Sequence, residues 1–471
     1  MKLKDLLENN AITSIGDTEI SSITDDTRKV KKGSLFFCIK GGNFDGHSAA
    51  AEMLEKGAAA VVCEHDLGLG DKQIVATDSR RLYGEVCAAW FAHPEKKMTF
   101  IGVTGTNGKT TTTSIIKHIL MTTGHKTGLI GTIQNEIGDE ILHTENTTPL
   151  AFEYMEVLAK MAEAGCEYVV MEVSSFALVQ KRIGSTHFKL AVFTNLTQDH
   201  LDYHKDMDDY YQAKKLLFDM CDTAIINIDD DYGRRLFNEV NCNKISLSVK
   251  ENADYFADNI TIKSTGSSFV LNKETSIKSP IPGMFNVSNI TAAFAVCREL
   301  GIDSVQAIAD YNGVKGRCEV IPTGRDFTVI CDYAHTPDAI ENILRSVKEY
   351  TDNRLICLFG CGGNRDAAKR PKMAQAAAKY ADRLIVTSDN PRNEVPEEII
   401  KDILVGLEKT DIPYDVVVDR KEAVFHGLQI AEKGDIIVLA GKGHEDYQIL
   451  AGMKHIHFDE REIVAEGLKL L

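Results

Sequence analysis

The sequence predicts an α/β fold in three domains, of which the central and C-terminal ones are each built on a parallel sheet. The chain has 471 residues, which is too long for a single hydrophobic core and favours roughly three domains. Through the middle and last parts, short apolar runs alternate with amphipathic segments, a pattern typical of βαβ units. Polar residues and glycines follow directly after these runs.

Two polar links divide the chain. The segment HPEKKM, residues 93–98, precedes the apolar run IGVTG, and the segment IPTGRD, residues 321–326, precedes the run FTVIC. We therefore predict domains at residues 1–97, 98–321 and 322–471, with boundaries set to within a few residues.

Seven apolar runs are typical of buried strands, and each is followed by residues that can bind ligands. FIGV leads to TGTNGKTT, YVVM to EVSS, LAVFTN to LTQDH, FTVIC to DYAHTPD, RLICLFG to CGGNRD, ADRLIVT to SDNPR and DIIVLA to GKGHED. In open parallel sheets, ligands bind outside the carboxyl ends of the strands. The pattern predicts two sheets, each with a site at that edge.

Composition and charge exclude several classes of protein. The chain is 44% hydrophobic and 26% charged, which indicates a folded globular protein. A net charge of -16 argues against general binding of nucleic acid or anionic membranes, so an anionic ligand needs a local cationic pocket. No apolar run approaches the roughly 18 residues of a membrane span, and the N-terminus MKLKDLLENN lacks a signal-peptide apolar segment. We expect a cytoplasmic protein.

The 11 cysteines are scattered, without a CxxC pair. This distribution favours buried free thiols in a reducing compartment over a disulfide framework. Cys361, beside a Gly-Gly pair, is the strongest candidate for a reactive thiol, although an inert thiol is the favoured interpretation.

The segment TGTNGKTTT, residues 104–112, is predicted to be a phosphate loop between a strand and a helix over residues 109–123. Two glycines let backbone N–H groups point at phosphate oxygens, and the helix N-terminus adds a positive partial charge. Lys109 would reach the β and γ phosphates, and the Thr110 hydroxyl would bind Mg²⁺. The alternative is a tight glycine turn without a ligand; Val103 also departs from the general spacing, which has glycine there. The residues predicted to contact ATP are Gly105, Thr106, Asn107, Gly108, Lys109, Thr110 and Thr111.

Three further residues are candidates for a metal site. Glu172 ends the run YVVME and His200 closes NLTQDH. A carboxylate at a strand end next to a phosphate loop is a natural ligand for Mg²⁺, although Glu172 could be a surface acid and His200 a helix cap. Lys214, in YYQAKKLLF, is on composition alone a solvated helix lysine.

Four motifs, TGTNGKTTT, MEVSS, NLTQDHLDYH and the pattern Tyr-x-x-Ala-Lys-x-x-Leu-Phe from Tyr210, occur in an order that resembles the Mur ligase family. These are ATP-dependent amide ligases that build the peptidoglycan peptide. The resemblance implies that Lys214 is carbamoylated, as N6-carboxylysine, and binds a second Mg²⁺ with Glu172 and His200. Carbon dioxide adds to a neutral amine, which burial would favour. Lys109, Lys214, Glu172 and His200 are thus the expected catalytic residues.

The resemblance extends over all three predicted domains. It implies an N-terminal domain for a UDP-sugar substrate, a central P-loop ATPase domain and a C-terminal Rossmann-like domain for an amino acid. The segment from Asp25 to Gly41 resembles the nucleotide-sugar motif of the branch that makes the UDP-N-acetylmuramoyl tripeptide, although a strand-leading turn is the alternative for its DTR. The residues expected to hold the UDP-N-acetylmuramoyl dipeptide are Thr27, Gly46, His47, Ser48, Asn146, Thr147, Thr148, Ser174, Gln180 and Arg182.

Further ATP contacts are implied by NVSNITAA, GRCE and DYAHTPDA. They would come from Asn289, Arg317, Asp332 and His335. Asn289 could instead cap a helix together with Asn286. The pair Thr336–Pro337 is a good start for the following helix, and that local role does not exclude a ligand role for its neighbours.

The motif DNPR, by resemblance, marks ligases that add meso-diaminopimelate rather than lysine. Diaminopimelate resembles lysine with an extra carboxylate, and Arg392 offers a planar fork for it. Pro391 fixes its own φ and disfavours helix at the residue before it. The alternative is a solvent-facing arginine at a helix start. The residues expected to bind diaminopimelate are Arg365, Asp389, Asn390, Pro391, Arg392, Gly441 and Glu445.

The implied reaction joins meso-diaminopimelate to UDP-N-acetylmuramoyl-L-alanyl-D-glutamate with ATP and Mg²⁺, through an acyl phosphate. We expect a monomer, with neither nucleic acid nor membrane as a partner. Three alternatives remain: the same reaction with L-lysine, a folylpolyglutamate synthase-like ligase, and a nucleotide-dependent switch protein. A guanine-reading NKxD segment is absent from the sequence, and neither of the last two alternatives accounts for DNPR.

Overall fold

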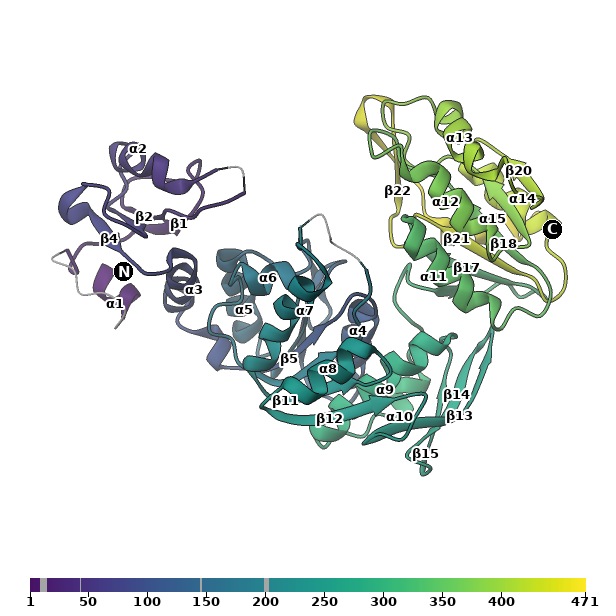
Figure 1. The fold of residues 1–471 in the computed structure, drawn as a ribbon, viewed down its shortest axis with the longest axis horizontal. Coiled ribbons are helices and arrows are strands. Elements are labelled where there is room, and N and C mark those ends of the chain that lie inside the picture. Colours follow the sequence, from purple (N-terminus) through teal and green to yellow (C-terminus); the bar gives the residue numbers. More distant parts are fainter. Residues whose placement is uncertain (9–14, 43, 145, 199–202) are drawn as a thin grey trace. The chain divides into compact units, whose positions relative to one another are not determined.

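The structure is a computed structural model that describes residues 1–8, 15–42, 44–144, 146–198 and 203–471 (Figure 1). The chain divides into two compact units. One comprises Met1–Leu247 with Ala295–Ile302, and the other Ser248–Phe294 with Asp303–Leu471.

The first unit begins with a four-stranded parallel sheet in the order β1-β2-β3-β4. The last helix of this segment, α3, packs against α5 of the following sheet. The elements are α1 (Leu3–Leu7), β1 (Ser22–Thr24), β2 (Ser34–Phe37), η1 (Gly46–Ala49), α2 (Ala50–Glu55), β3 (Ala60–Cys63), η2 (Gly70–Lys72), β4 (Gln73–Val75), α3 (Ser79–Trp90) and η3 (Pro94–Lys96).

The larger sheet of this unit has β5 between β9 and β10, with β11 and β12 beyond β10 and β6 beyond β9, all parallel. Two antiparallel strands, β7 and β8, extend it next to β6. The elements are β5 (Thr99–Thr104), α4 (Lys109–Thr122), β6 (Thr127–Ile130), β7 (Asn135–Ile137), β8 (Glu140–Leu142), α5 (Ala151–Glu163), β9 (Tyr168–Glu172), α6 (Ser175–Val179), β10 (Phe188–Phe193), α7 (Met207–Lys215), η4 (Leu216–Asp219), β11 (Cys221–Asn227), α8 (Asp231–Glu239) and β12 (Asn243–Ser248).

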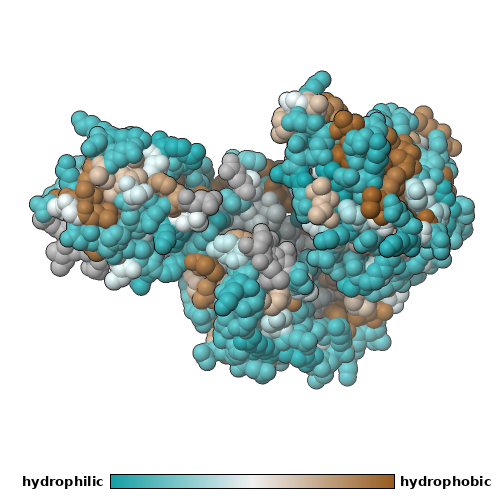
Figure 2. Space-filling view, turned by 45° about the horizontal axis from the view of Figure 1, so that its top comes forward, coloured by the Kyte–Doolittle hydropathy of each residue, from teal (hydrophilic) through white to brown (hydrophobic). Residues whose placement is uncertain are grey.

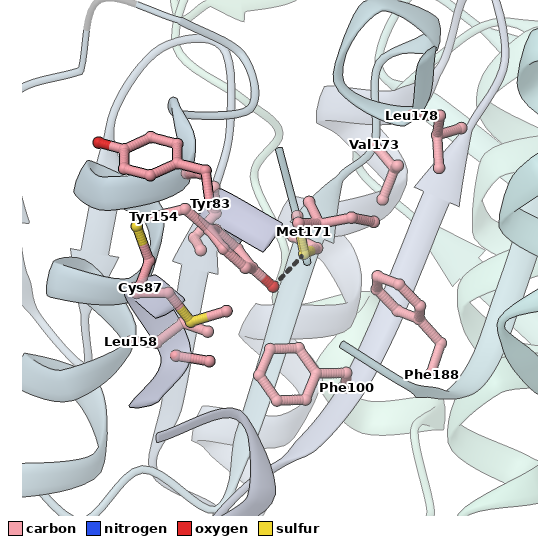
Figure 3. Packing of buried hydrophobic residues seen from close by; sticks show 14 of the residues in the cluster. Tyr83, Cys87, Phe100, Tyr154, Leu158, Met171, Val173, Leu178 and Phe188 are labelled. Atoms are coloured by element: carbon pink, nitrogen blue, oxygen red, sulfur yellow. Dashed lines mark hydrogen bonds between the residues drawn. The ribbon is translucent and has the colours of Figure 1, made fainter. Parts of the chain in front are cut away.

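A hydrophobic cluster lies between these strands and helices α3 and α5 (Figure 3). Phe100 and Phe188 meet edge to face, with ring centroids 6.1 Å apart. Tyr154 is buried among them, and its hydroxyl is 3.0 Å from the Thr186 hydroxyl and 3.6 Å from the Met171 sulfur. The polar end of this tyrosine is therefore satisfied inside the core.

The second unit starts with an antiparallel β-meander and ends with a six-stranded sheet in the order β16-β17-β21-β18-β19-β20. Only β16 of the six runs antiparallel to its neighbour. The elements are β13 (Tyr255–Lys263), β14 (Gly266–Leu271), β15 (Thr275–Ser279), α9 (Met284–Glu299), α10 (Val305–Ala309), β16 (Glu319–Ile321), β17 (Thr328–Asp332), α11 (Pro337–Lys348), β18 (Leu355–Phe359), α12 (Lys369–Ala378), β19 (Arg383–Val386), α13 (Pro396–Leu404), η5 (Val405–Leu407), β20 (Tyr414–Val416), α14 (Arg420–Ile430), β21 (Ile436–Ala440), β22 (Tyr447–Leu450), η6 (Ala451–Met453), β23 (Lys454–His457) and α15 (Glu460–Gly467).

Helices cover both faces of the six-stranded sheet (Figure 1). Strand residues Cys357 and Phe359 pack in a cluster with α11, α12 and α13, whereas their neighbours Ile356 and Leu358 pack with α14 and α15. Successive side chains of a strand point to opposite faces, so a continuous apolar run is required when both faces are covered. This explains why the sequence shows unbroken apolar runs here.

The face drawn in Figure 2 is largely hydrophilic, with separate apolar patches. Across the described ranges, none of the helices combines the length and the apolar character needed to cross a membrane.

All eleven cysteines are free, as expected, and burial raises the pKa of Cys361 to about 12. A thiol with that pKa stays protonated at neutral pH, which agrees with the favoured interpretation of an inert Cys361.

The seven predicted runs all form strands, namely β5, β9, β10, β17, β18, β19 and β21. The predicted helix over residues 109–123 is α4, which ends at Thr122. The Thr336 hydroxyl accepts a hydrogen bond from the backbone N–H of Ala339, so the predicted cap of α11 is also confirmed. The division of the chain at about residues 97 and 322 stays a prediction.

Replacing Tyr154 by phenylalanine should lower the free energy of unfolding by about 1–3 kcal/mol, because the Thr186 hydroxyl is then buried without its partner. The double variant Tyr154→Phe/Thr186→Val should recover part of this loss, since it removes both polar groups. Denaturant titration of the three proteins measures the effect. A double variant that is less stable than Tyr154→Phe would contradict it.

Candidate active site

The predicted phosphate loop joins β5 to α4 with two glycines in the left-handed region, Gly105 at φ 149° and Gly108 at φ 87°. The side chain of Lys109 folds back over the loop, and its Nζ donates to the carbonyls of Gly105 and Thr106, each at 2.9 Å. A cation therefore lies against the loop on the side where α4 begins, as a phosphate site requires.

Residues after β10 hold the loop in this shape. The Thr194 hydroxyl donates to the Asn107 carbonyl at 2.7 Å, and the Asn195 side-chain oxygen accepts the Asn107 N–H at 3.0 Å. A Cβ atom on Gly105 would lie 1.9 Å from the Thr194 hydroxyl oxygen. Only glycine fits this position, because β10 approaches the loop so closely.

Glu172, at the end of β9, is buried, with 1% of its surface exposed. One carboxylate oxygen accepts hydrogen bonds from the Thr110 hydroxyl at 3.0 Å and the Thr132 N–H at 2.8 Å, and the other accepts the Thr132 hydroxyl at 3.0 Å. The interpretation as a surface acid is therefore wrong. The hydroxyl and the carboxylate predicted to bind Mg²⁺ lie within hydrogen-bonding distance of each other.

Lys214, on α7, is also buried, and only 2% of its surface is exposed. Its Nζ donates to the Gly105 carbonyl at 2.9 Å and lies 4.5 Å from the centre of the Tyr210 ring. The interpretation from composition, a solvated helix lysine, is wrong because α7 packs this side chain against the phosphate loop. Lys214 and Lys109 thus share one carbonyl acceptor.

The third predicted ligand, His200, lies outside the described residues. Within the described ranges no group of three or more His, Cys, Asp or Glu side chains is arranged to hold a metal ion. The oxygens of Thr110 and Glu172 nevertheless fit Mg²⁺, which prefers one or two carboxylates together with substrate phosphates.

The residues predicted to hold the dipeptide form a connected hydrogen-bond network next to Glu172. The Thr148 hydroxyl donates to the Glu172 carbonyl at 2.8 Å and accepts the Ser174 N–H at 3.1 Å. Arg182 donates to the Thr148 carbonyl at 3.0 Å and to the Gln180 side-chain oxygen at 2.8 and 2.9 Å. The structure therefore brings these predicted residues together with the phosphate loop.

Two more predicted residues precede this network in the chain. The Thr147 hydroxyl is 3.1 Å from that of Thr132, and the Asn146 carbonyl accepts the Thr144 hydroxyl at 2.8 Å. Thr132 was not predicted. Its position two residues after β6 became significant only when the fold placed that strand beside β9.

The N-terminal candidates lie in connections of the small parallel sheet: Thr27 between β1 and β2, and Gly46, His47 and Ser48 in η1 after β2. His47 is 2.7 Å from the Asp45 carboxylate, and its other ring nitrogen accepts the Glu64 N–H at 3.0 Å. Ser48 donates to the Asp45 carbonyl at 2.7 Å within the turn that begins at Gly46. The Thr27 carbonyl accepts the Lys56 ammonium at 3.4 Å.

The carboxyl edge of the six-stranded sheet carries a second group of charged residues. Asp389 and Asn390 follow β19, and Gly441 and Lys442 follow β21. The Asn390 amide donates to Glu445 at 3.1 Å, and a Cβ atom on Gly441 would lie 2.6 Å from the Asp389 carboxylate. Four of the residues predicted for diaminopimelate therefore lie within one small region.

The two predicted arginines both lie next to Gly362. A Cβ atom at Gly362 would be 2.9 Å from an Arg392 guanidinium nitrogen and 3.8 Å from the Arg365 Cγ. Arg392 is half-buried, has φ 51° and donates to the Gly363 carbonyl at 3.0 Å, whereas Arg365 is exposed. The helix α13 starts only at Pro396, so the alternative of a solvent-facing arginine at a helix start is wrong.

Loops 360–366 and 387–395 pack closely against each other. A Cβ atom at Gly363 would lie 2.0 Å from the Pro391 carbonyl oxygen. Glu394 accepts a hydrogen bond from the Asn364 N–H and pairs with the buried Arg370 at 2.7 Å. Arg370 belongs to α12, so helix packing fixes the loop that displays the Arg392 guanidinium.

The remaining ATP candidates of this unit are Arg317, Asp332, His335 and Asn289. Asp332 accepts the backbone N–H groups of Cys318 at 2.7 Å and Ala334 at 2.8 Å, and burial raises the pKa of this carboxyl. The Arg317 guanidinium lies 5.2 Å from the centre of the Tyr333 ring.

The Tyr333 ring is also flanked by two imidazoles. Its centre lies 4.7 Å from that of His335 and 4.8 Å from that of His444. Burial, followed by the charge of Arg317, lowers the pKa of His444 to about 4. The two imidazoles are tilted against the Tyr333 ring by 59° and 42°, so together with Arg317 they offer aromatic and cationic contacts to a ligand. The sequence did not predict that Tyr333 and His444 belong to this site, because only the fold brings the loop after β17 next to the loop after β21.

Asn289 lies within α9 and donates to Asn286 at 3.4 Å, while Asn286 donates to the Pro282 carbonyl at 2.7 Å. Both asparagines are buried inside the first turns, not ahead of the helix, so the alternative that they are N-caps is wrong.

Lys442 is a fully buried charged residue that the sequence analysis missed: none of its side chain is exposed. Its Nζ donates to Asn390 at 2.6 Å, to the Tyr447 carbonyl at 2.8 Å and to Glu445 at 3.1 Å. The only signal in the sequence was a lysine between two glycines directly after a predicted buried strand.

Comparisons with known proteins agree with this geometry. Three family models match the chain: "Mur ligase family, catalytic domain" over residues 19–89, "Mur ligase middle domain" over 103–297 and "Mur ligase, glutamate ligase domain" over 316–443. The chain belongs to the Mur ligase family. Its fold, an α/β architecture in three domains with a central ATPase domain, is confirmed by these matches.

Curated relatives in this family match along the whole chain. A protein of Clostridioides difficile strain 630 is 43% identical over 482 aligned residues, which cover 99% of each chain, and one of Clostridium acetobutylicum is 45% identical with full coverage of both. The first is named UDP-N-acetylmuramoyl-L-alanyl-D-glutamate--2,6-diaminopimelate ligase, and the second has the same name followed by the number 1. A solved structure with the same name is 30% identical, has a TM-score of 0.76 and covers 100% of this chain and 99% of that one.

Replacing Gly105 by alanine should raise the Kd for ATP by about 10- to 100-fold, because the new Cβ atom must push the Thr194 side chain away from the Asn107 carbonyl. The matched control is Gly124→Ala, at φ 92° beyond the end of α4, where nothing lies within 4 Å of an added Cβ atom. Calorimetric titration with ATP measures the Kd of both variants. Equal affinities for ATP in the two variants would contradict the expected crowding.

Proposed function

We propose that this protein is an ATP-dependent ligase that adds meso-diaminopimelate to UDP-N-acetylmuramoyl-L-alanyl-D-glutamate, a step of peptidoglycan precursor synthesis. The observation that carries the proposal is the half-buried guanidinium of Arg392, held by the Gly363 carbonyl beside Arg365. The relatives named above, which share more than 40% of their residues with this chain, support the same substrate.

The first step would activate the D-glutamate carboxylate. In this step the carboxylate attacks the γ phosphorus of ATP, the bond to ADP breaks, and an acyl phosphate forms. Mg²⁺, when bound by Thr110 and Glu172, would offset phosphate charge during this transfer. Lys109, whose ammonium lies against the loop carbonyls, would turn toward the phosphates.

In the second step the neutral diaminopimelate amine attacks the acyl carbon, the bond from that carbon to phosphate breaks, and the proton lost by the nitrogen leaves with the phosphate as hydrogen phosphate. The protein mainly positions the reactants, of which ATP and the UDP-linked dipeptide are anions that would otherwise repel each other. Thr148, Ser174, Gln180 and Arg182 would hold the dipeptide end next to the phosphate loop, because their network ends on the Glu172 carbonyl. We place Asn146 and Thr147 in the same role.

The nucleotide parts of the two substrates would be bound by residues outside this network. Thr27, Gly46, His47 and Ser48 would contact the UDP moiety. Asn289, Arg317, Asp332 and His335 would bind the adenosine part of ATP. The Tyr333 ring supports the second assignment, since it offers an aromatic contact next to a guanidinium and two imidazoles.

Lys214 would act as a carbamate. Its burial disfavours the charged ammonium, and the neutral amine is the form that adds carbon dioxide. The product would be a carboxylate beside the phosphate loop, and Glu172 and His200 would complete the ligands of a second Mg²⁺.

For the amino acid, Arg392 and Arg365 would each bind one carboxylate, while Glu445 and the Gly441 backbone would accept an ammonium. Asp389, Asn390 and Pro391 would shape the same pocket. With lysine bound, one carboxylate is missing and Arg392 lacks its partner. We further propose that the protein is a monomer. We infer a cytoplasmic location, because both ATP and the nucleotide-linked substrate are cytoplasmic compounds.

An assay that offers diaminopimelate, lysine and ornithine in parallel tests the specificity. Loss of a partner from a desolvated charged pair costs roughly 2–5 kcal/mol, so kcat/KM for lysine should be lower than for diaminopimelate by about 30-fold or more. Arg392→Ala should remove most of this preference by lowering kcat/KM for diaminopimelate alone. Arg345→Ala, on the exposed side of α11, is the control. Equal efficiency of the unaltered enzyme with lysine would refute the assignment.

Lys214→Ala should lower the ligation rate by at least about 100-fold, since a metal ligand is lost. Removal of bicarbonate should lower the rate of the unaltered enzyme reversibly, and ¹³C-labelled bicarbonate should give a carbamate signal that Lys214→Ala lacks. The adjacent Lys215→Ala, which loses only an ion pair with Glu239, should keep the signal. Full activity of Lys214→Ala would refute the carbamate.

A further inference from the structure

The buried lysine at the carboxyl edge of the six-stranded sheet has every donor of its ammonium in use. Lys442 Nζ donates to the Asn390 side-chain oxygen, the Tyr447 carbonyl and Glu445 Oε2, and it lies 3.8 Å from the Asp389 carboxylate. Because its side chain is fully buried, it cannot contact a ligand from solvent. Its effect must pass through the groups that it holds.

The first of these groups is the Asn390 amide. Its oxygen accepts two hydrogen bonds, from Lys442 Nζ at 2.6 Å and from the backbone N–H of Ile449 at 2.9 Å. Both partners are obligatory donors, so the orientation of the amide is fixed. Its NH₂ group must then face Glu445, to which it donates at 3.1 Å.

The second group is the Glu445 carboxylate. Lys442 and Asn390 both donate to the same oxygen, Oε2, each at 3.1 Å. An ionised carboxylate can accept further hydrogen bonds on its other oxygen. This arrangement leaves Oε1 as the atom that an incoming ammonium would meet.

Charge balance supports the same conclusion. Asp389 and Glu445 place two carboxylates around a single lysine cation, and their side chains are 11% and 14% exposed. With Lys442 present, the cluster keeps one net negative charge, which suits one ammonium group. Without it, the two largely buried carboxylates would lose the ammonium that lies 3.8 Å from Asp389 and 3.1 Å from Glu445.

We propose that Lys442 is a positioning residue that orients the Glu445 carboxylate, through Asn390, to receive an ammonium group of the amino acid substrate. The inference rests on the proposed function, because it assigns a role within the amino acid pocket. Lys442 itself touches no substrate; it sets both the direction of Glu445 and the charge of the pocket.

The test compares Lys442→Met with the unaltered enzyme in the full ligation reaction. We expect KM for diaminopimelate to rise by about 10- to 100-fold, as for other supporting hydrogen-bond partners of a site. KM for ATP and for the UDP-linked dipeptide should change by less than about twofold, since those sites do not depend on Glu445. Unchanged KM for diaminopimelate would overturn the proposal.

A matched control is Arg354→Met. Arg354 pairs with Asp435 at 2.6 Å ahead of β18 and β21, at the opposite end of the same strands. Its loss removes a partly buried cation from the same sheet and should lower thermal stability without raising KM for diaminopimelate. Equal increases of that KM in both variants would mean that Lys442 acts only through stability, and would overturn the proposal.

A double-mutant comparison tests the route through Glu445. In a Glu445→Gln background, Lys442→Met should have a much smaller effect on KM for diaminopimelate, because the oriented carboxylate is already absent. Full additivity of the two effects would overturn the proposal. If Lys442→Met does not fold, Lys442→Gln keeps a donor without the charge and is measured in its place, with the same outcomes.

The unaltered enzyme separates this inference from the proposed function. If it ligates no amino acid, or uses lysine as well as diaminopimelate, the proposed function fails. If it prefers diaminopimelate but the Lys442 variants keep its KM, only the positioning role fails.

Discussion

Buried charge at the carboxyl ends of parallel strands is the constraint on which the rest of the structure depends. Glu172, at the end of β9, and Lys214, which α7 packs against the phosphate loop, are both nearly inaccessible to water, and each is held by groups of that loop or its neighbours. In the second unit, Lys442 occupies a similar position among Asn390 and Glu445. An unpaired buried charge is costly, so each of these side chains needs fixed partners, and the fixed partners make a fixed site.

Glycines make this close packing possible where side chains would collide. Gly105 allows β10 to approach the phosphate loop, and Gly363 allows loops 360–366 and 387–395 to touch. The consequence is rigidity: Arg392 is displayed by a loop that Arg370 and Glu394 hold against α12. A guanidinium fixed in advance loses less freedom on binding and discriminates more strongly against a ligand that lacks its partner.

The two lysines of the first unit illustrate how one loop can serve two purposes. Lys109 and Lys214 donate to the same carbonyl, that of Gly105. One comes from the helix that follows the loop, and the other from α7, about a hundred residues later in the chain. We infer that the first neutralises transferred phosphate, while the second becomes an anion once carbon dioxide is added. Their proximity would let the charge of the site change sign locally without any movement of the sheet.

The sequence by itself determined the seven buried strands, the phosphate loop and the start of α11, because apolar runs, glycine spacing and caps are local properties. It also carried the motifs that resemble the Mur ligase family. It could not determine that Lys214 is buried, that Thr132 supports Glu172 or that Lys442 holds Asn390 and Glu445. Those facts depend on which strands become neighbours and how closely their loops pack. Residues far apart in the chain meet only through sheet order, so only the tertiary structure could decide them.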